Sequence, residues 1–377
     1  MTPVRGKRVT DQEHAAAWVQ SAGEREVFDE KSFAHLIALE RKRTERSGEP
    51  FLLLLIEPGE RLGAGFPLEG VAQALLAHSR ETDLLGWHKQ GRALGVLYTA
   101  FDRENSAHMQ SIIESRIRQI FEDESFNGIY DLLQLSFHPF PDQWRHAQGE
   151  MPIDAALYTD LHRPAHLRRV QLLFKRALDL LVSATLLLLL LPVFLLIALA
   201  IKLSSEGPIF FRQKRVGQYG RLFTFLKFRS MYLNNDHKVH QEFIHRFIKS
   251  SGEASSHEPV YKLTGDKRIT PVGGFLRRTS LDELPQFINV LLGEMSLVGP
   301  RPAIPYEVEA YQTWHRRRVL EARPGITGLW QVAGRSRVKF DDMVRMDLRY
   351  AASWSLWLDL KILILTPFAV IRGTGAY

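Results

Sequence analysis

The stretch LLVSATLLLLLLPVFLLIALAI, residues 180–201, contains no charged side chain and shows more about the fold of this chain than any other segment. As an α-helix it would extend about 33 Å, enough to cross the hydrocarbon core of a bilayer. A buried helix this long and this apolar is unusual in a soluble domain. Pro192 lies near its centre, where it removes one intrahelical hydrogen bond and bends the helix.

The charges on either side favour a helix that enters and leaves the membrane through one leaflet. Lys175 and Arg176 precede the stretch and Lys202 follows it, so the preference of basic residues for the cytoplasmic side selects neither orientation. If both flanks are cytoplasmic, a single segment has to turn back within the bilayer; a helix that spans the membrane is the alternative. The sequence therefore predicts a re-entrant membrane helix over residues 170–205, bent at Pro192.

Length and charge limit the classes of protein to consider. The chain has 377 residues, enough for two or three domains, and a formal net charge of +7, which indicates anionic partners. It has no cysteine, so disulfides and thiolate metal sites are excluded. The first residues lack the apolar core of a signal peptide. Nucleic acid is not an expected partner, because no nucleic-acid-reading module is recognisable.

The region before the apolar stretch divides into a patterned part and a linker. Helical and strand periodicities alternate over residues 1–140 in the order helix, strand, helix, two strands, helix, strand, which predicts a compact α/β domain. Residues 141–169 show little periodicity and are interpreted as a linker. Residues 206–377 follow the membrane segment and are predicted to form a separate C-terminal domain.

Two adjacent acids, Asp282 and Glu283, stand in the basic stretch RRTSLDELPQF, residues 277–287. One interpretation is helix capping, since Ser280 and Glu283 have the spacing of a capping box. Pro285 opposes that register, because it would be the fifth helical residue. A proline is tolerated in the first turn, so we expect a helix to begin at about Asp282. The acids would then lie at the positive end of its dipole, and capping alone remains open.

Basic residues surround this pair in the sequence. The stretch RLFTFLKFRSM, residues 221–231, alternates in a way that predicts a strand pair with one cationic face, carrying Lys227 and Arg229. Arg301 lies between two prolines, and Arg335 follows a glycine turn. Such residues form either a solvated face or a phosphate-binding surface, since guanidinium groups match phosphate oxygens bidentately. Cations also stabilise an ionised Asp282, and Mg²⁺ suits two carboxylates beside substrate phosphates.

Four ordered motifs, in KRALDLLVSATLLLLLLPVF, RQKRVGQYGRLFTFLKFRSM, GDKRITPVGGFLRRTSLDELPQFINVLLGEMSLVGPRP and RPGITGLWQVAGR, resemble the bacterial sugar transferases, or monotopic phosphoglycosyl transferases. The resemblance covers about residues 170–377. It implies a re-entrant helix and a mainly α catalytic domain with interfacial amphipathic helices. It assigns catalysis and metal binding to Asp282 and Glu283, with Mg²⁺ as cofactor. It implies phosphate contacts for Lys227, Arg229, Arg277, Arg278, Arg301 and Arg335.

In that family the aspartate attacks the β-phosphate of a UDP-sugar, UMP leaves, and polyprenyl phosphate takes the phosphosugar from the aspartyl intermediate. The resemblance thus implies a UDP-sugar, undecaprenyl phosphate and the lipid of the bacterial inner membrane, on its cytoplasmic face, as partners. It fixes neither the sugar nor the oligomeric state, and a homodimer remains open. The alternative is a non-catalytic, membrane-associated scaffold whose N-terminal domain senses a nucleotide.

The N-terminal region resembles the catalytic domain of GGDEF-type diguanylate cyclases, a ferredoxin-like sheet. The segment RETDLLGWHKQGRALGVLYTA matches the hairpin that carries the family signature, but residues 88–92 read HKQGR there. The first strand ends in Ile56-Glu57-Pro58, without the expected pair of metal-binding aspartates. The resemblance implies a degenerate domain that does not cyclise nucleotides; an unrelated α+β domain is the alternative.

Three details depart from the transferase pattern or leave its interpretation open. Leu191 precedes the proline where relatives often have serine, which questions how sharply the helix bends. Residues 234–262 look like an insertion, and we expect a solvated loop and helix there despite four histidines. Asp359 and Lys361 interrupt the last apolar stretch, residues 353–371, whose Trp354 and Trp357 suit an interfacial helix, with a core helix as the alternative.

Overall fold

The computed structural model describes residues 26–63, 66–99, 106–123, 129–142, 153–160, 166–232, 241–242, 244, 246–248, 268–333 and 338–371. The chain divides into two compact units. The first comprises residues up to Asp142 together with Ala155–Asp160, and the second comprises Gln143–Asp154 and everything from Leu161 onward.

The first unit has the predicted order of helices and strands. Its elements are α2 (Glu30–Ser47), β1 (Phe51–Pro58), α3 (Glu69–His78), β2 (Leu84–Lys89), β3 (Ala93–Tyr98), α4 (Ser106–Asp123), the 3₁₀ turn η1 (Tyr130–Leu132) and β4 (Leu133–Phe140). The strands form one sheet in the order β2-β3-β1-β4, with antiparallel neighbours throughout. This is the strand order of a split β-α-β unit, as in a ferredoxin-like sheet.

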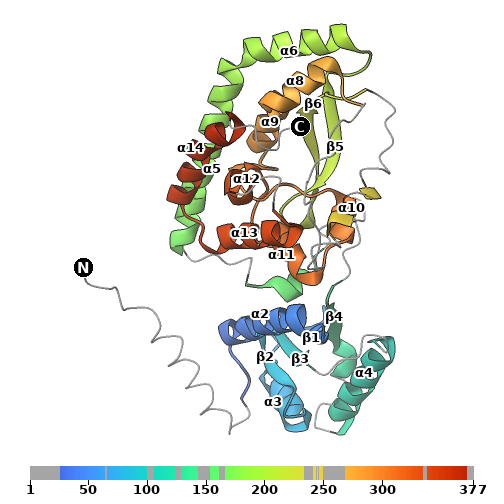
Figure 1. The fold of residues 1–377 in the computed structure, drawn as a ribbon. Helices are drawn as coiled ribbons and strands as arrows, with labels where there is room; N and C mark the ends of the chain where they lie inside the picture. The colour runs from blue at the N-terminus through green and yellow to red at the C-terminus, as the bar shows by residue number, and fades with distance from the viewer. Residues whose placement is uncertain are drawn as a thin grey trace, which may run out of the picture. The chain divides into compact units, whose positions relative to one another are not determined.

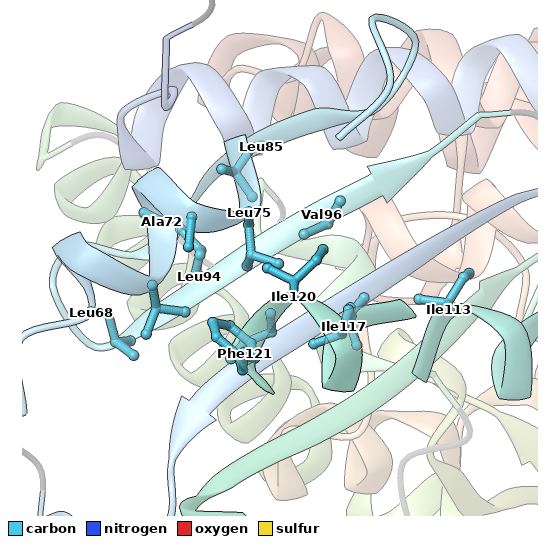
Figure 2. Packing of buried hydrophobic residues seen from close by; sticks show 14 of the residues in the cluster. Leu68, Ala72, Leu75, Leu85, Leu94, Val96, Ile113, Ile117, Ile120 and Phe121 are labelled. Atoms are coloured by element: carbon cyan, nitrogen blue, oxygen red, sulfur yellow. The ribbon is translucent and has the colours of Figure 1, made fainter. Parts of the chain in front are cut away.

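The core of this unit forms because β1 is apolar on both faces. Leu52, Leu54 and Ile56 are buried against α3 and α4, together with Leu75 and Phe121. Figure 2 shows this packing, with Leu75 from α3 and Ile120 from α4 approaching each other over the sheet. A central strand that is covered on both sides is expected to be almost continuously hydrophobic, as FLLLLI is here.

Part of the predicted linker packs against the first unit. The 3₁₀ turn η2 (Ala155–Tyr158) buries Leu157 and Tyr158, whose hydroxyl donates to the Asp142 carboxylate at 3.1 Å. The Arg41 guanidinium lies 4.5 Å from the centre of the Tyr158 ring and pairs with Asp160. These contacts anchor the described part of residues 141–169, while the predicted domain boundaries stay predictions.

The long apolar stretch is broken into two helices, α5 (His166–Leu189) and α6 (Leu191–Ser204), which meet at an angle of 61°. Figure 1 shows this bend between the two green helices. The break falls at Leu190, two residues before Pro192, because a proline in the first turn of α6 has no amide that needs a partner. Leu191 in place of serine therefore does not prevent a sharp bend. Among the described residues no single helix is long and apolar enough to cross a membrane; only this bent pair meets that criterion, by length and composition.

The second unit combines helices with two small sheets. After α6 come β5 (Phe210–Val216), the 3₁₀ turn η3 (Gln218–Gly220), β6 (Leu222–Phe228), α8 (Pro271–Thr279), the 3₁₀ turn η4 (Leu281–Glu283), α9 (Gln286–Leu292) and β7 (Ser296–Val298). They are followed by α10 (Pro305–Glu309), η5 (Thr313–Arg316), α11 (Arg317–Glu321), β8 (Gly325–Thr327), α12 (Leu329–Ala333), α13 (Phe340–Ala352) and α14 (Leu356–Ile371). Strands β5 and β6 form an antiparallel hairpin, and β7 pairs with β8 in parallel.

The hairpin was predicted, but the prediction of one cationic face is wrong. Lys227 is opposite Phe211, and Arg215 is opposite Phe223, so these two cations share one face of the hairpin. Arg212 is opposite Leu226 and lies on the other face. The reason is that Arg212 and Arg215 are an odd number of residues apart, and successive side chains of a strand point to opposite faces.

Charged residues in the middle of α5 bind other parts of the second unit. The Lys175 ammonium lies 2.5 Å from the Asp359 carboxylate on α14, and Arg176 donates to the carbonyls of Val290 and Leu291 at the end of α9. Asp179 accepts hydrogen bonds from the Ser296 hydroxyl and the Leu297 amide. These charges are therefore buried partners of the fold, and Asp359 interrupts an apolar helix because it faces Lys175.

The predicted insertion, residues 234–262, lies mostly outside the described residues, as do its four histidines. Of the part described, Ile244, Phe247 and Ile248 are buried in the same apolar cluster as Phe340. This short piece therefore contributes to the core of the second unit.

Candidate active site

The two adjacent acids lie in the short turn η4, between α8 and α9. Ser280 ends α8 in the left-handed conformation, with φ of 59°, and its side chain makes no capping hydrogen bond. The capping-box interpretation is therefore wrong, and α9 begins at Gln286 rather than at about Asp282. Pro285 precedes the first residue of that helix, so the acids lie outside the first turn of α9.

Two close contacts hold this turn beside strand β6. Gly273 in α8 packs so tightly that a Cβ atom there would lie 2.0 Å from the Ser230 carbonyl oxygen. From α9, the buried Asn289 donates to the Thr224 carbonyl at 2.8 Å and accepts from the Leu226 amide at 3.1 Å. Because α9 is fixed to β6 and α8 is packed against the residues that directly follow this strand, the side chain of Lys227 is brought to the acids.

Lys227 is a charged partner of both acids. Its ammonium lies 2.7 Å from the Glu283 carboxylate and 3.6 Å from the Asp282 carboxylate. The three side chains are largely removed from solvent, with exposures of 17 % for Lys227, 9 % for Asp282 and 26 % for Glu283. The Phe225 ring lies on the same face of the hairpin, 5.6 Å from the ammonium. Partial burial strengthens these charge–charge contacts relative to a solvated surface pair.

Arg229, which the sequence predicted to bind phosphate, has another position. Its guanidinium is buried and donates to the carbonyl oxygens of Ile201, Ser205 and Glu206, and to the Ser205 hydroxyl. A cation at the end of α6 satisfies carbonyls that the helix leaves without partners. We therefore correct the prediction: Arg229 anchors the end of α6, and its side chain is committed to the fold.

The other predicted cations occupy separate elements. Arg277 and Arg278 belong to the last turn of α8, directly before the acids, where Arg277 is half-buried and Arg278 is exposed. Arg301 follows β7 and is half-buried. Arg335 lies outside the described residues. The structure thus places Arg277 and Arg278 in the element that leads into the acid pair, and Lys227 in direct contact with the pair.

Two buried arginines hold the turn that carries Arg301. The sequence did not predict this structural role for either of them. Arg215 donates to the Pro302 carbonyl at 2.8 Å, and Arg318 donates to the Arg301 carbonyl at 3.3 Å. Arg318 also pairs with Asp347 at 2.7 Å, both being almost fully buried. Asn289 was missed in the same way. None of these roles has a signal in the sequence, because each depends on contacts between elements far apart in the chain.

Two buried ionisable groups of this unit have strongly shifted pKa values. Complete burial raises the pKa of Asp347 to about 6, against the opposite effect of Arg318. Burial lowers the pKa of His315 to about 4, against the effect of its hydrogen-bond partner Asp341. Asp347 lies in α13, and His315 is hydrogen-bonded to Asp341 of the same helix. These pKa shifts therefore affect the pH dependence of folding stability.

The acid pair in η4 offers two carboxylates to the Mg²⁺ ion that the sequence predicted. Within the described residues no group of three or more His, Cys, Asp or Glu side chains could hold a metal ion. Asp282 and Glu283 nevertheless fit Mg²⁺, which binds through one or two carboxylates and completes its shell with substrate phosphates and water. The donor set is thus suited to a metal that arrives together with a phosphorylated substrate.

The first unit contains a cavity of about 230 Å³ between α3, α4 and the sheet. Its apolar lining includes Leu75 and Ile117, which Figure 2 shows within the core, and its polar side includes His78, Arg80 and Arg116. Arg116 donates to the His78 carbonyl at 2.6 Å.

A comparison with protein families identifies the second unit. Residues 170–373 match the family described as bacterial sugar transferase. The chain belongs to the bacterial sugar transferase family. The matched region of this sugar transferase includes α5, α6, the hairpin, the acid pair and α14, which are the elements that build the candidate site.

Curated relatives match the same part of this sugar transferase. "Galactosyl transferase CpsE" of Streptococcus agalactiae is 45 % identical over 174 residues, which is 46 % of this chain and 37 % of that protein. "Undecaprenyl-phosphate galactose phosphotransferase" of Salmonella typhimurium is 43 % identical, over 56 % of this chain and 43 % of that protein. "Exopolysaccharide production protein ExoY" of Sinorhizobium fredii is 42 % identical, over 54 % of this chain and 88 % of that protein. The chain thus spans about two fifths of the length of several of these relatives.

One solved structure resembles another part of the chain. It is described as a DGC protein from Thermotoga maritima, with 15 % identity, 31 % of this chain and 85 % of that chain covered, and a TM-score of 0.24. Agreement at that level carries no argument about the first unit, whose resemblance to GGDEF-type domains stays a prediction.

Proposed function

We propose that this sugar transferase moves a sugar 1-phosphate from a UDP-sugar to undecaprenyl phosphate and releases UMP. The observation that supports this most directly is the acid pair in η4, half-enclosed and in contact with Lys227, in the unit that also carries the bent apolar helices. Relatives named "UDP-glucose:undecaprenyl-phosphate glucose-1-phosphate transferase" match 55–56 % of this chain at 41–42 % identity. The names of the ExoY relatives support a role in exopolysaccharide production.

In the proposed first step, a carboxylate oxygen of Asp282 attacks the β-phosphorus of the UDP-sugar. The bond from that phosphorus to the bridging oxygen breaks, UMP leaves with the electron pair, and a phosphosugar-aspartyl intermediate remains. In the second step an oxygen of undecaprenyl phosphate attacks the same phosphorus and frees the Asp282 carboxylate. The product is an undecaprenyl-diphosphate-linked sugar.

The division of roles between the two acids follows from their distances to Lys227. Glu283 makes the short contact, at 2.7 Å, whereas Asp282 lies 3.6 Å from the same ammonium. We assign the attack to Asp282, whose carboxylate lies farther from this ammonium, and the contact with Lys227 and a share of the metal to Glu283. Mg²⁺ bound by these carboxylates would neutralise charge on the diphosphate. Arg277, Arg278, Arg301 and Arg335 remain proposed phosphate contacts.

The proposed location is the cytoplasmic face of the inner membrane, with α5 and α6 re-entering the same leaflet. Apolar side chains of these helices are largely exposed, for example Leu188 at 76 % and Leu203 at 79 %. On α14, exposed Trp357, Leu360, Ile364 and Phe368 repeat at intervals of three and four residues, which places them on one helical face. Such a face suits an interfacial helix, so we keep that interpretation for α14.

For the first unit we propose a regulatory role without nucleotide cyclisation. Glu57, at the end of β1, lies 4.0 Å from Lys89 in β2, so the acid at this position already has a cationic partner from the hairpin. We propose that its cavity is the place where a regulatory nucleotide would bind. We also propose that the whole chain forms a homodimer.

The test is UMP release by the full chain in detergent or nanodiscs, with Mg²⁺, undecaprenyl phosphate and a panel of UDP-sugars. We expect Asp282→Asn to lower the rate by at least about a thousandfold, since the nucleophile is lost. Asp342→Asn is the matched control, because it removes the same charge from an exposed acid that pairs only locally with Arg345. UMP release that survives in Asp282→Asn would exclude the proposed nucleophile, and the absence of UMP release from every donor would favour the scaffold.

A further inference from the structure

The structure holds an ammonium group where a metal ion would meet the acid pair. We propose that Lys227 neutralises Asp282 and Glu283 in the donor-free protein, and that a divalent metal binds there only together with a diphosphate that draws Lys227 away. This inference rests on the proposed function, and it assigns an order of binding to the same site. It concerns what Lys227 does before the donor arrives.

The contact geometry supports this role for Lys227. Its ammonium is 2.7 Å from Glu283 and 3.6 Å from Asp282, so its positive charge faces both carboxylates. The strand beneath it is fixed by Asn289, which binds the backbone of Thr224 and Leu226. Lys227 therefore approaches the acids from a rigid element, and only its flexible side chain has to move.

The charges then favour one cation at a time. A divalent ion held by the same two carboxylates would lie within a few ångströms of the ammonium, and like charges at that distance in a half-enclosed site repel strongly. The described residues supply no third acidic ligand to compensate. A metal alone thus competes with Lys227 for two ligands, which is an unfavourable exchange for an ion that loses its hydration reluctantly.

A diphosphate changes this balance in two ways. It adds oxygen ligands that Mg²⁺ prefers, and it gives Lys227 another anionic partner within reach of its flexible four-carbon chain. Lysine binds phosphate as a mobile point charge, whereas arginine at this position would keep a fixed fork on the carboxylates. The exchange explains why a lysine, rather than an arginine, suits position 227.

The experiment measures Mn²⁺ binding to the full chain by the loss of the free Mn²⁺ signal in electron paramagnetic resonance, without any nucleotide. We expect Lys227→Met, which keeps the volume and removes the charge, to bind Mn²⁺ at least ten times more tightly than the wild type. The gain should disappear in the triple variant that also carries Asp282→Asn and Glu283→Gln. Equal Mn²⁺ affinity in wild type and Lys227→Met would overturn the proposal.

Two further measurements make the result unambiguous. Lys214→Met removes the same charge from the other face of the hairpin, where the ammonium lies 3.3 Å from the Thr224 hydroxyl, and should leave Mn²⁺ affinity as in the wild type. Lys227→Gln is the substitute if Lys227→Met does not fold. In the wild type, added UDP should raise the protein-bound Mn²⁺ above the level seen with UDP and the acid-pair double variant, and no rise would contradict the proposal. UMP release is scored separately, so failure of the transferase reaction and failure of this inference are distinct outcomes.

Discussion

At the scale of single residues, the second unit depends on buried charges that have specific partners. Asp359 is 1 % exposed and is bound by Lys175, by the Tyr350 hydroxyl and by the Trp354 indole. A buried pair of this kind contributes little net stability, but removing one partner leaves a charge without compensation. The charges that flank and interrupt the apolar stretches therefore specify how α5 and α14 meet.

Asp347 gives a pH-dependent prediction at this scale. Its pKa is raised to about 6 from 3.8, so the folded protein binds a proton there that the unfolded chain does not bind between these values. This contribution to stability is present below pH 4 and is lost as the pH rises through 6. Relative to Asp347→Asn, we expect the wild type to gain roughly 3 kcal/mol of unfolding free energy as the pH falls from 7 to 4.

The measurement is denaturant unfolding of both proteins at several pH values in the same detergent. The pKa of His315 is lowered to about 4, so protonation of this residue reduces the stability of the fold as the pH falls from 7 to 4. Both proteins contain His315, so its effect cancels in the difference between them. A difference between wild type and variant that stays constant from pH 4 to 7 would show that Asp347 does not titrate as described.

At the scale of elements, the site depends on how closely α8 approaches β6. Gly273→Ala would place a Cβ atom 2.0 Å from the Ser230 carbonyl oxygen, so α8 has to move away from the segment that directly follows β6. We expect this variant to lose stability by about 2 kcal/mol or more and to release UMP more slowly, because η4 moves with α8. Thermal unfolding and UMP release measure the two effects.

Gly274→Ala is the control one residue further along the same helix. There the new Cβ atom would lie 3.9 Å from the Ile269 side chain, an ordinary contact. Alanine also favours the helix by up to about 1 kcal/mol over glycine, so this variant should be as stable as the wild type or slightly more stable. Equal behaviour of the two variants would contradict the tight packing of α8.

The bent pair of helices supports a second prediction at this scale. Since the chain has no cysteine, single-cysteine variants label without background. Gln171→Cys, near the start of α5, and Glu206→Cys, after the end of α6, are both at exposed positions. In a re-entrant arrangement a membrane-impermeant maleimide should label both from the cytoplasmic side only, in inverted vesicles and not in intact spheroplasts. Labelling from opposite sides would show that the pair crosses the membrane.

At the scale of the whole molecule, the chain consists of two units, each with its own apolar core. The ExoY relative from Sinorhizobium fredii aligns over 88 % of its own length with only 54 % of this chain. The residues that match the family, 170–373, lie within the second unit. This favours a transferase region that folds without the first unit.

We accordingly predict that residues 161–377 alone release UMP in the assay described above, at a rate within about tenfold of the full chain. The reason is that the acid pair, Lys227, Asn289 and the bent helices all belong to the second unit. A soluble or aggregated fragment without activity, in the presence of an active full chain, would show that the first unit contributes to folding or to the site.

Much of this organisation could be predicted from the sequence because it depends on local patterns. The order of helices and strands in the first unit follows from hydrophobic periodicity, and the β5–β6 hairpin follows from alternation. The bend near Pro192 follows from the missing amide of proline. The acid pair stands out because carboxylates are rare in so basic a stretch, and the family match supports the resemblance on which their roles were predicted.

What the sequence determined by itself is the set of elements and the identity of the two acids, since both are properties of neighbouring residues. Only the tertiary structure decided which cation meets them: Lys227 reaches the pair, while Arg229, two residues later, turns to the end of α6. Residues two apart in a strand face the same side, but β6 ends at Phe228, so Arg229 lies beyond the strand and is not bound by that alternation. The start of α9 and the partner of Asp359 were decided in the same manner, by contacts between segments more than a hundred residues apart or by a backbone turn at Ser280 that no pattern signals.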